Sequence, residues 1–173
     1  MSAPQHDDAT RRDFLYVFSG TAAAAGVAVT AWPFIDQMNP SAATQALATT
    51  EVDLAPIQPG QQITVMWQGK PTWVRRRTPE EVEQVRSMSN SALKDPQPDE
   101  ARVQKAEWLV VIGICTHLGC IPNRDNAGQQ GGYLCACHGS VYDASGRILR
   151  GPAPLNLEVP PYKFVSDTLI SIG

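Results

Sequence analysis

The chain has 173 residues, of which 43% are hydrophobic, and a formal net charge of −3 at pH 7. This length allows one domain of ordinary size plus an appendage, and the mildly acidic balance without a basic stripe excludes nucleic acid as an expected partner. The one local basic run, 75–77, is interpreted as a solvated strand end rather than a phosphate-binding site. No lysine or arginine occurs between Arg12 and Lys70, so the N-terminal part needs its own explanation.

The first predicted element is the segment 14–35, FLYVFSGTAAAAGVAVTAWPFI, which contains no charged side chain. As a helix it would span ~33 Å, enough for a hydrocarbon core of ~30 Å. Aromatic residues lie near both ends, and Arg11 and Arg12 precede it. The positive-inside rule therefore predicts a single transmembrane helix, with residues 1–13 in the cytoplasm and everything after Ile35 across the membrane.

The motif TRRDFL, residues 10–15, resembles the twin-arginine export signal, an address for proteins that cross the membrane already folded. Such export suits a protein whose cofactor is inserted in the cytoplasm. Small residues at 41–43 would permit cleavage, so a signal peptide and a retained anchor are both open, and the segment's length favours the anchor. Residues 36–51, rich in Ala, Ser and Thr, are predicted to be a flexible tether or hinge, with a frayed helix end as the alternative.

From residue 52 to residue 173 the pattern changes to short strands, which predicts a mostly antiparallel β head large enough for a core. The helix in this part is expected to begin at Thr78, because Thr78 and Glu81 can form a capping box around Pro79. The predicted elements are a hairpin of 61–67 and 71–76, a helix over 78–85, a polar surface excursion over 89–105, a buried strand over 107–114 and a closing hairpin of 162–166 and 168–172.

Two hexapeptides, CTHLGC at 115–120 and CACHGS at 135–140, contain all four cysteines and two of the three histidines. In each, a short loop can bring a Cys and a His side chain together on a metal. Two thiolates and two imidazoles suit either a tetrahedral zinc ion or a [2Fe–2S] cluster with Cys on one iron and His on the other. The extra cysteine pair, the hydroxyl-rich flank and the export of a folded unit oppose zinc.

Spacing alone leaves the cysteine pairing open, since four cysteines permit three pairings. Cys137 is adjacent to His138, which is poor spacing for sharing one metal centre. Nothing in the local sequence decides between Cys115 and Cys120 as the second ligand.

The two hexapeptides resemble the motifs of Rieske iron–sulfur proteins, specifically the Rieske subunit of the bacterial quinol–cytochrome c reductase (cytochrome bc) complex. GPAP at 151–154 and the order of export motif, apolar segment and tether match the bacterial form, so the resemblance covers nearly the whole chain. Ala136 stands where the family usually has proline, which removes no ligand. The resemblance implies an all-β fold: a Rieske domain of antiparallel sheets over 52–173, with an inserted cluster-binding subdomain at about 113–154.

The resemblance also implies the site residues of one Rieske [2Fe–2S] cluster. Cys115 and Cys135 would bind one iron and His117 and His138 the other. A disulfide between Cys120 and Cys137 would tie the loops together, which fits the oxidising far side of a bacterial membrane. The other implied roles are redox tuning by Ser140 and Tyr142, docking through Leu118, and bracing of the loops by Gly151, Pro152 and Pro154.

Replacing two thiolates by neutral imidazoles predicts a high-potential cluster, in a class that spans roughly −150 to +300 mV. An iron-bound imidazole can also titrate near physiological pH, so one electron and one proton can be taken together from a hydroquinone. By resemblance, His138 accepts the hydrogen bond of the quinol and its proton, and His117 lies near the surface as well.

The function implied is electron transfer in ubiquinol–cytochrome c reductase, an oxidoreductase and translocase of the bacterial inner membrane. The periplasmic head would move on its tether between quinol bound at cytochrome b and a c-type cytochrome, in an expected dimeric assembly. The alternative is the Rieske subunit of a periplasmic molybdenum enzyme such as arsenite oxidase, against which GPAP and the retained anchor argue. A ring-hydroxylating oxygenase would need two further histidines, and only His6 remains.

Overall fold

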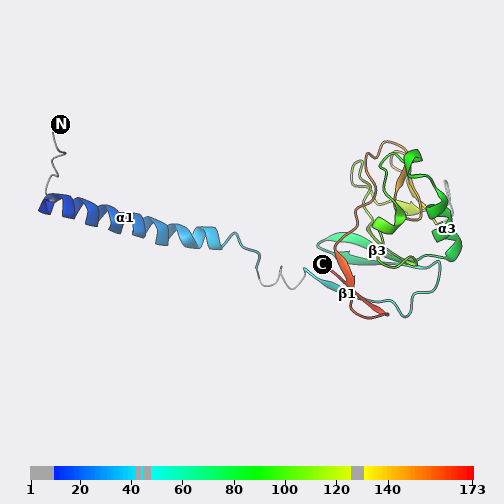
Figure 1. Ribbon diagram of the computed structural model, residues 1–173, viewed down its shortest axis with the longest axis horizontal. Helices are drawn as coiled ribbons and strands as arrows, with labels where there is room; N and C mark the ends of the chain where they lie inside the picture. Colours follow the sequence, from blue (N-terminus) through cyan, green and yellow to red (C-terminus); the bar gives the residue numbers. More distant parts are fainter. Residues whose placement is uncertain (1–9, 42–43, 45–47, 126–130) are drawn as a thin grey trace, which may run out of the picture. The chain divides into compact units, whose positions relative to one another are not determined.

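The computed structural model describes residues 10–41, 44, 48–125 and 131–173. The chain divides into two compact units, Met1–Thr44 and Gln45–Gly173. One long helix forms the described part of the first unit, and all the strands belong to the second (Figure 1). His6 lies outside the described residues.

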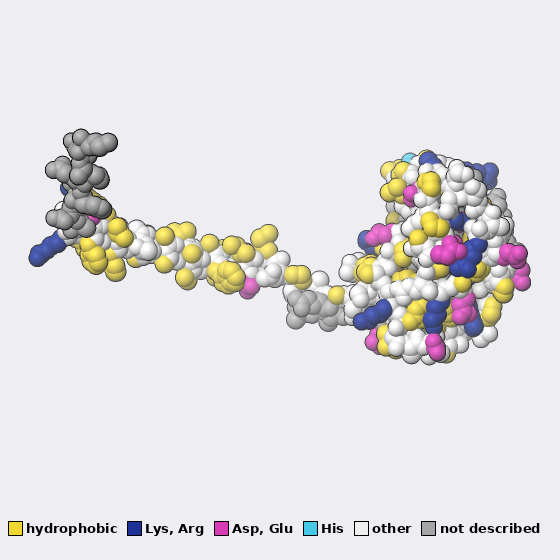
Figure 2. Space-filling view, viewed as in Figure 1, with side chains coloured by type: hydrophobic (Ala, Val, Ile, Leu, Met, Phe, Trp, Pro, Cys, Tyr) yellow, Lys and Arg dark blue, Asp and Glu magenta, His cyan; other side chains and the backbone are white. Residues whose placement is uncertain are grey.

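The long helix α1 spans Arg11–Asp36, which confirms the apolar helix expected over 14–35. Thr10 caps its N-terminus, because the side chains and backbone N–H groups of Thr10 and Asp13 bond reciprocally in a capping box. Within the described ranges it is the one helix long and apolar enough to cross a membrane. Hydrophobic side chains run along the face of α1 seen in Figure 2, so the helix offers an apolar surface along its length.

The tether expected over 36–51 is described only in part, since residues 42–43 and 45–47 lie outside the described ranges. At its C-terminal side the structure differs from the expectation. Strand β1, Thr50–Asp53, begins two residues before the expected start of the head at 52. Ala48 already belongs to the head, because its carbonyl accepts a hydrogen bond of 2.7 Å from the indole Nε1 of Trp67.

Every strand pair described in the head is antiparallel, as predicted, and the strands form three sheets (Figure 1). In spatial order they are β1, β10 (Leu169–Ile172) and β9 (Tyr162–Phe164); β2 (Gln62–Trp67), β3 (Lys70–Arg76) and β4 (Trp108–Ile112); and β5 (Asn123–Arg124), β6 (Tyr133–Cys135), β7 (Ser140–Tyr142) and β8 (Ile148–Arg150). Both predicted hairpins are confirmed. The β2–β3 turn is made by Gln68 and Gly69, which both have positive φ, as a two-residue hairpin turn requires.

Helix α3, Pro79–Ser87, confirms the predicted capped helix, since Thr78 and Glu81 form the expected capping box. Two short 3₁₀ turns, η1 (Asn90–Ala92) and η2 (Asp99–Ala101), follow within the expected surface excursion over 89–105. That expectation is wrong in part: the segment buries Leu93, Asp99 and Arg102. The two charged residues are buried because ionic and hydrogen-bonding partners lie elsewhere in the head.

The interpretation of 75–77 as a solvated strand end is wrong for two of its three arginines. Arg75 and Arg77 are buried, whereas Arg76 stays partly exposed. Arg75 forms an ion pair with Glu81, and Arg77 binds both carboxylate oxygens of Asp99, at 2.6 and 3.2 Å. Arginine can be buried at these positions because each guanidinium meets a carboxylate from another part of the chain.

Strand β4 joins the two cores of the head, because its side chains alternate between them. Val110 and Ile112 pack with β1, β3 and β10 in the first core. Leu109 and Val111 pack in the second core with Trp73, Tyr133, Tyr142 and both non-disulfide cysteines. The second core therefore places the Cys/His loops directly beyond the end of a fully buried strand.

Candidate metal centre

The two hexapeptides form two turns of the same design. Gly119 donates its backbone N–H to the carbonyl of Cys115 at 3.0 Å, and Gly139 donates to that of Cys135 at 2.9 Å. Both glycines have φ near +80°, at 81° and 76°, a conformation that favours glycine. Each loop thus begins at a cysteine and turns back on itself within four residues, which brings the side chains of the two loops together.

The expected disulfide is present: Cys120 and Cys137 are bonded, with their Cα atoms 6.8 Å apart. It joins one loop to the other and leaves Cys115 and Cys135 as free, buried cysteines. The sulfurs of Cys120, Cys135 and Cys137 lie within 4.8 Å of one another, but two of them are oxidised and cannot bind a metal as thiolates. The two remaining thiols are therefore the sulfur donors of the site.

The two loop histidines also converge. The ring centroids of His117 and His138 lie 4.7 Å apart, with the rings nearly perpendicular at 87°. His138 is exposed and His117 is half-buried. Nδ1 of His117 is buried and has no hydrogen-bond partner within the described ranges. Buried polar atoms are normally paired, so this inward nitrogen lacks the partner that a metal would supply, and the donor set of two sulfurs and two imidazoles fits a [2Fe–2S] cluster.

Hydrogen-bond donors surround the sulfur of Cys115. The hydroxyl of Tyr142 donates to its Sγ at 3.2 Å, and the side chain of Ser140 and the backbone N–H of His117 help to lower the pKa of its thiol. Both Ser140 and Tyr142 are fully buried on β7. The sequence-predicted tuning residues thus lie against a predicted ligand.

Burial and these contacts shift the pKa values of both free thiols and of the Tyr142 hydroxyl. Burial raises the pKa of the Cys115 thiol, but hydrogen bonds from Tyr142, the His117 backbone, Cys135 and Ser140 outweigh it and hold that pKa below its usual value. Burial and the adjacent Cys115 thiol raise the pKa of Cys135. Burial also raises the pKa of the Tyr142 hydroxyl, which therefore stays a donor at neutral pH.

The 151–156 segment packs against both loops. At Gly151, where φ is 104°, an added Cβ would lie 2.5 Å from Cα of Ser140, so no larger residue fits. Ala153 donates its N–H to Oγ of Ser140 at 3.1 Å. Pro152 and Pro154 are exposed, so these two residues stiffen the segment while its glycine and alanine make the contacts.

Thr116 is a site residue that the sequence reasoning missed. Its hydroxyl donates to the carbonyl of Leu155 at 2.6 Å, and its N–H donates to the Tyr142 hydroxyl at 3.3 Å. Its place inside CTHLGC is the one sequence signal that pointed to it. It links the first loop to the 151–156 segment and orients the tyrosine donor.

The tip of the site is apolar. Leu118 is 70% exposed, which fits the expected docking residue, and two leucine-sized neighbours, Ile121 and Leu155, are also largely exposed. Figure 2 shows histidine atoms at the surface of the head beside hydrophobic side chains. An exposed imidazole beside apolar side chains suits contact with a partner that buries both.

Two family models match the chain. Residues 57–162 match the Rieske [2Fe-2S] domain, and residues 1–41 match the "Ubiquitinol-cytochrome C reductase Fe-S subunit TAT signal". The chain is 55% identical over 170 residues to the ubiquinol-cytochrome c reductase iron-sulfur subunit of Rhodospirillum rubrum, covering 96% of this chain and 93% of that protein. The chain belongs to the Rieske iron–sulfur subunits of ubiquinol–cytochrome c reductase.

Other comparisons agree on this Rieske subunit. The corresponding subunit of Bradyrhizobium diazoefficiens is 57% identical over 175 residues, covering 99% of each chain. A chain of the solved structure titled "Hyperthermophilic respiratory Complex III" matches with a TM-score of 0.55 and 26% identity, over 89% of this chain and 98% of that one. The cofactor of the family is one Rieske-type [2Fe–2S] cluster. The export-signal match and the apolar helix α1 together indicate a membrane-anchored subunit.

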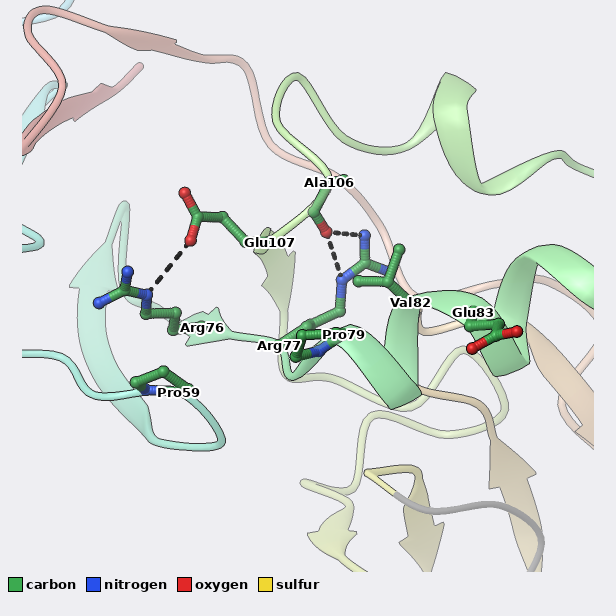
Figure 3. A pocket seen from close by; sticks show the side chains of 8 residues that line it. All are labelled: Pro59, Arg76, Arg77, Pro79, Val82, Glu83, Ala106 and Glu107. Atoms are coloured by element: carbon green, nitrogen blue, oxygen red, sulfur yellow. Dashed lines mark hydrogen bonds and ion pairs between the residues drawn. The ribbon is translucent and has the colours of Figure 1, made fainter.

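A separate hollow of about 520 Å³ in the Rieske head lies between the end of β3 and helix α3 (Figure 3). An ion pair between Arg76 and Glu107, at 3.3 Å, and hydrogen bonds from Arg77 to the carbonyl of Ala106 border it. None of its lining residues is a cysteine or histidine. This hollow therefore takes no part in the metal centre.

Proposed function

We propose that Cys115 and Cys135 bind one iron of the [2Fe–2S] cluster and that His117 and His138 bind the other. The observation that carries the assignment is the convergence of two buried free thiols and two perpendicular imidazole rings on loops joined by one disulfide. The unpartnered inward Nδ1 of His117 supports imidazole ligation. The disulfide fastens the loops, so that the four donors stay in place.

As a Rieske subunit of ubiquinol–cytochrome c reductase, the chain transfers electrons in that oxidoreductase. We assign quinol bound at cytochrome b as the electron donor and a c-type cytochrome of the same dimeric complex as the acceptor. The cluster supplies a one-electron couple of high potential, because neutral imidazoles replace two thiolates. Hydroxyls of Ser140 and Tyr142 stabilise negative charge on the sulfur of Cys115, which favours the reduced state.

The exposed His138 receives the hydrogen bond and the proton of the quinol hydroxyl, with His117 at its side. Its ring is exposed, which gives the substrate access to it. For His117 the buried Nδ1 leaves Nε2 as its outward nitrogen. Leu118 docks against the membrane subunit, together with Ile121 and Leu155, because all three present apolar surface beside the imidazoles.

The Rieske head lies in the periplasm, α1 crosses the inner membrane, and the tether lets the head move between donor and acceptor. Arg11 and Arg12 before α1, with no further positive charge until Lys70, support this orientation. The Cys120–Cys137 disulfide supports it as well, since disulfides persist in an oxidising compartment. The molybdenum-enzyme alternative is not favoured, because the relatives that match over nearly the full length are reductase subunits.

The assignment is tested on the chain purified from membranes. We expect two irons and two acid-labile sulfides per chain, with the low-field electron paramagnetic resonance signal of mixed Cys/His ligation after reduction. His117→Gln and His138→Gln should each abolish this signal, whereas His6→Gln, which changes the one other histidine, should preserve it. One zinc per chain without sulfide, or an intact signal in either loop variant, would overturn the ligand assignment.

A further inference from the structure

Two consecutive residues outside the metal centre hold the 151–156 segment. Lys94 Nζ donates to the carbonyl of Gly151 at 3.0 Å and to that of Ala153 at 2.9 Å. Asp95 follows, and its Oδ2 accepts the backbone N–H of Asn156 at 2.9 Å while its carbonyl accepts the Asn156 side chain at 3.0 Å. These four contacts, which we call the Lys94–Asp95 strap, join the 89–105 segment to the segment packed against the cluster loops.

Lys94 supplies hydrogen-bond donors to backbone carbonyls of the 151–156 segment. Pro152 and Pro154 have no backbone N–H, so the segment has few donors of its own. The carbonyls of Gly151 and Ala153 each precede one of these prolines, and a lysine ammonium has three donors to offer. Next to Lys94, the side chain of Leu93 is buried, which fixes the backbone from which the lysine reaches.

The segment in turn controls Ser140. The N–H of Ala153 donates to Oγ of Ser140 at 3.1 Å. Because this bond occupies one lone pair of the oxygen, the hydroxyl hydrogen is directed away from Ala153 and is free to donate to another acceptor. The sulfur of Cys115 is the acceptor we assign to it, since the Ser140 side chain helps to lower the pKa of that thiol. Displacement of Ala153 would release that orientation.

We propose that Lys94 is a positioning residue for the redox potential: it holds Ala153 in place, and Ala153 orients the Ser140 hydroxyl toward Cys115. The proposal rests on the cluster assignment and on the tuning role of Ser140. Among the described residues, the hydrogen bonds of Lys94 go to Gly151 and Ala153 and not to a predicted ligand. Its influence passes from Lys94 to Ala153, 59 positions along the chain, and from Ala153 to Ser140, 13 positions back.

A double-mutant cycle on the full chain in its membrane complex separates this route from a through-space effect of charge. The variants are Lys94→Met, Ser140→Ala and the two combined. Lys94→Arg is a conservative rescue that keeps the charge and the donors. Lys163→Met, on the exposed face of β9, removes one positive charge away from the strap. The readouts are the midpoint potential and the deuterium uptake of the 151–156 segment.

We expect Lys94→Met to lower the reduced-to-oxidised ratio at fixed ambient potential about threefold and to speed deuterium uptake in 151–156, with Lys94→Arg close to wild type. In the Ser140→Ala background the Lys94→Met change should add little, and Lys163→Met should match wild type. Additive effects of Lys94→Met and Ser140→Ala, or an unchanged potential in Lys94→Met, would overturn the proposal. If Ser140→Ala alone leaves the potential unchanged, the tuning role of Ser140 fails and the proposal fails with it, while metal and sulfide analysis still tests the cluster separately.

Discussion

At the scale of single residues, the Tyr142 hydroxyl donates a hydrogen bond to a predicted ligand sulfur, 3.2 Å from Sγ of Cys115. Tyr142→Phe keeps the buried ring and removes the donor, so the cluster should assemble with a lower potential. A hydrogen bond to a charged group contributes ~1.5 kcal/mol, which corresponds to a fall of roughly 60 mV for one electron. Redox titration followed by electron paramagnetic resonance measures the change.

The matched control is Tyr162→Phe, because the Tyr162 hydroxyl is also hydrogen-bonded, to the N–H of Gln104 at 3.0 Å, but lies on β9. Its potential should equal that of the wild type. An unchanged potential in Tyr142→Phe, or an equal fall in both variants, would exclude Tyr142 as a specific tuning residue.

The sequence predicts those site residues that lie together in a short motif, and it does not predict those that come from distant parts of the chain. CTHLGC and CACHGS name every proposed ligand, but spacing could not decide between Cys115 and Cys120, because loop sequences do not give the distance between two loops. Lys94 was not predictable at all. Its contacts lie 57 and 59 positions away, and a polar, proline-containing stretch gives no sign of what it touches.

Between elements, Asp99 of η2 is the main ionic junction. Its carboxylate accepts hydrogen bonds from Arg77, which directly follows β3, and from Arg86 of α3 at 3.1 Å. It also accepts the hydroxyl of Ser145 at 2.7 Å, from the turn between β7 and β8. Burial alone raises the pKa of Asp99, but Arg77, Ser145 and Arg86 more than offset it and hold that pKa below its usual value.

Asp99→Asn keeps the shape and removes the charge, which leaves the buried guanidinium of Arg77 unpaired. The free energy of unfolding should fall by ~3–5 kcal/mol at neutral pH. Because the folded pKa of Asp99 is depressed, its stabilisation is present above ~pH 4, its unfolded pKa, and is lost as pH falls through the folded pKa. The stability gap between wild type and variant should therefore narrow as the pH falls below ~4.

Denaturant unfolding at several pH values measures that gap. Asp167→Asn is the control, since Asp167 pairs with Lys105 at 2.9 Å but is almost fully exposed, and this variant should differ little from wild type at any pH. A gap in Asp99→Asn that is small at neutral pH, or that widens on acidification, would contradict the role of the junction.

The elements that were predicted are those with local signals. The β2–β3 hairpin follows from Gln68-Gly69 between apolar strands, and α3 from its capping box. The sheet of β5 to β8 was not predicted strand by strand, because strands of two or three residues are too short for a periodic pattern. The burial of Arg75 and Arg77 was missed for another reason: their carboxylate partners follow them by 6 and 22 positions, and nothing in the sequence marks those pairs.

At the scale of the whole molecule, the arginine pair Arg11 and Arg12 should be required for the head to cross the membrane. Replacing Arg11 and Arg12 by lysines keeps the positive charge before α1 but removes the arginine pair of the motif that matches the export signal. Export of the head should slow by about tenfold or more, which corresponds to an increase of ~1.4 kcal/mol in the activation free energy of export. Protease digestion of spheroplasts measures it, and digestion equal to that of wild type would contradict a twin-arginine route.

The last prediction tests the proposed tether, on which the head would move between its electron donor and its acceptor. The carbonyl of Ala48 accepts a hydrogen bond from the Trp67 indole, so the prolines are placed before Ala48, in the proposed tether. Prolines at Ala43 and Ala46 fix φ at both positions and should slow quinol-driven cytochrome c reduction about tenfold. The cluster spectrum and midpoint potential should stay unchanged, because the metal centre is untouched. Serines at the same two positions are the control. Wild-type turnover in the proline variant would mean that transfer needs no flexible segment there, and a changed spectrum would place the effect in the head instead.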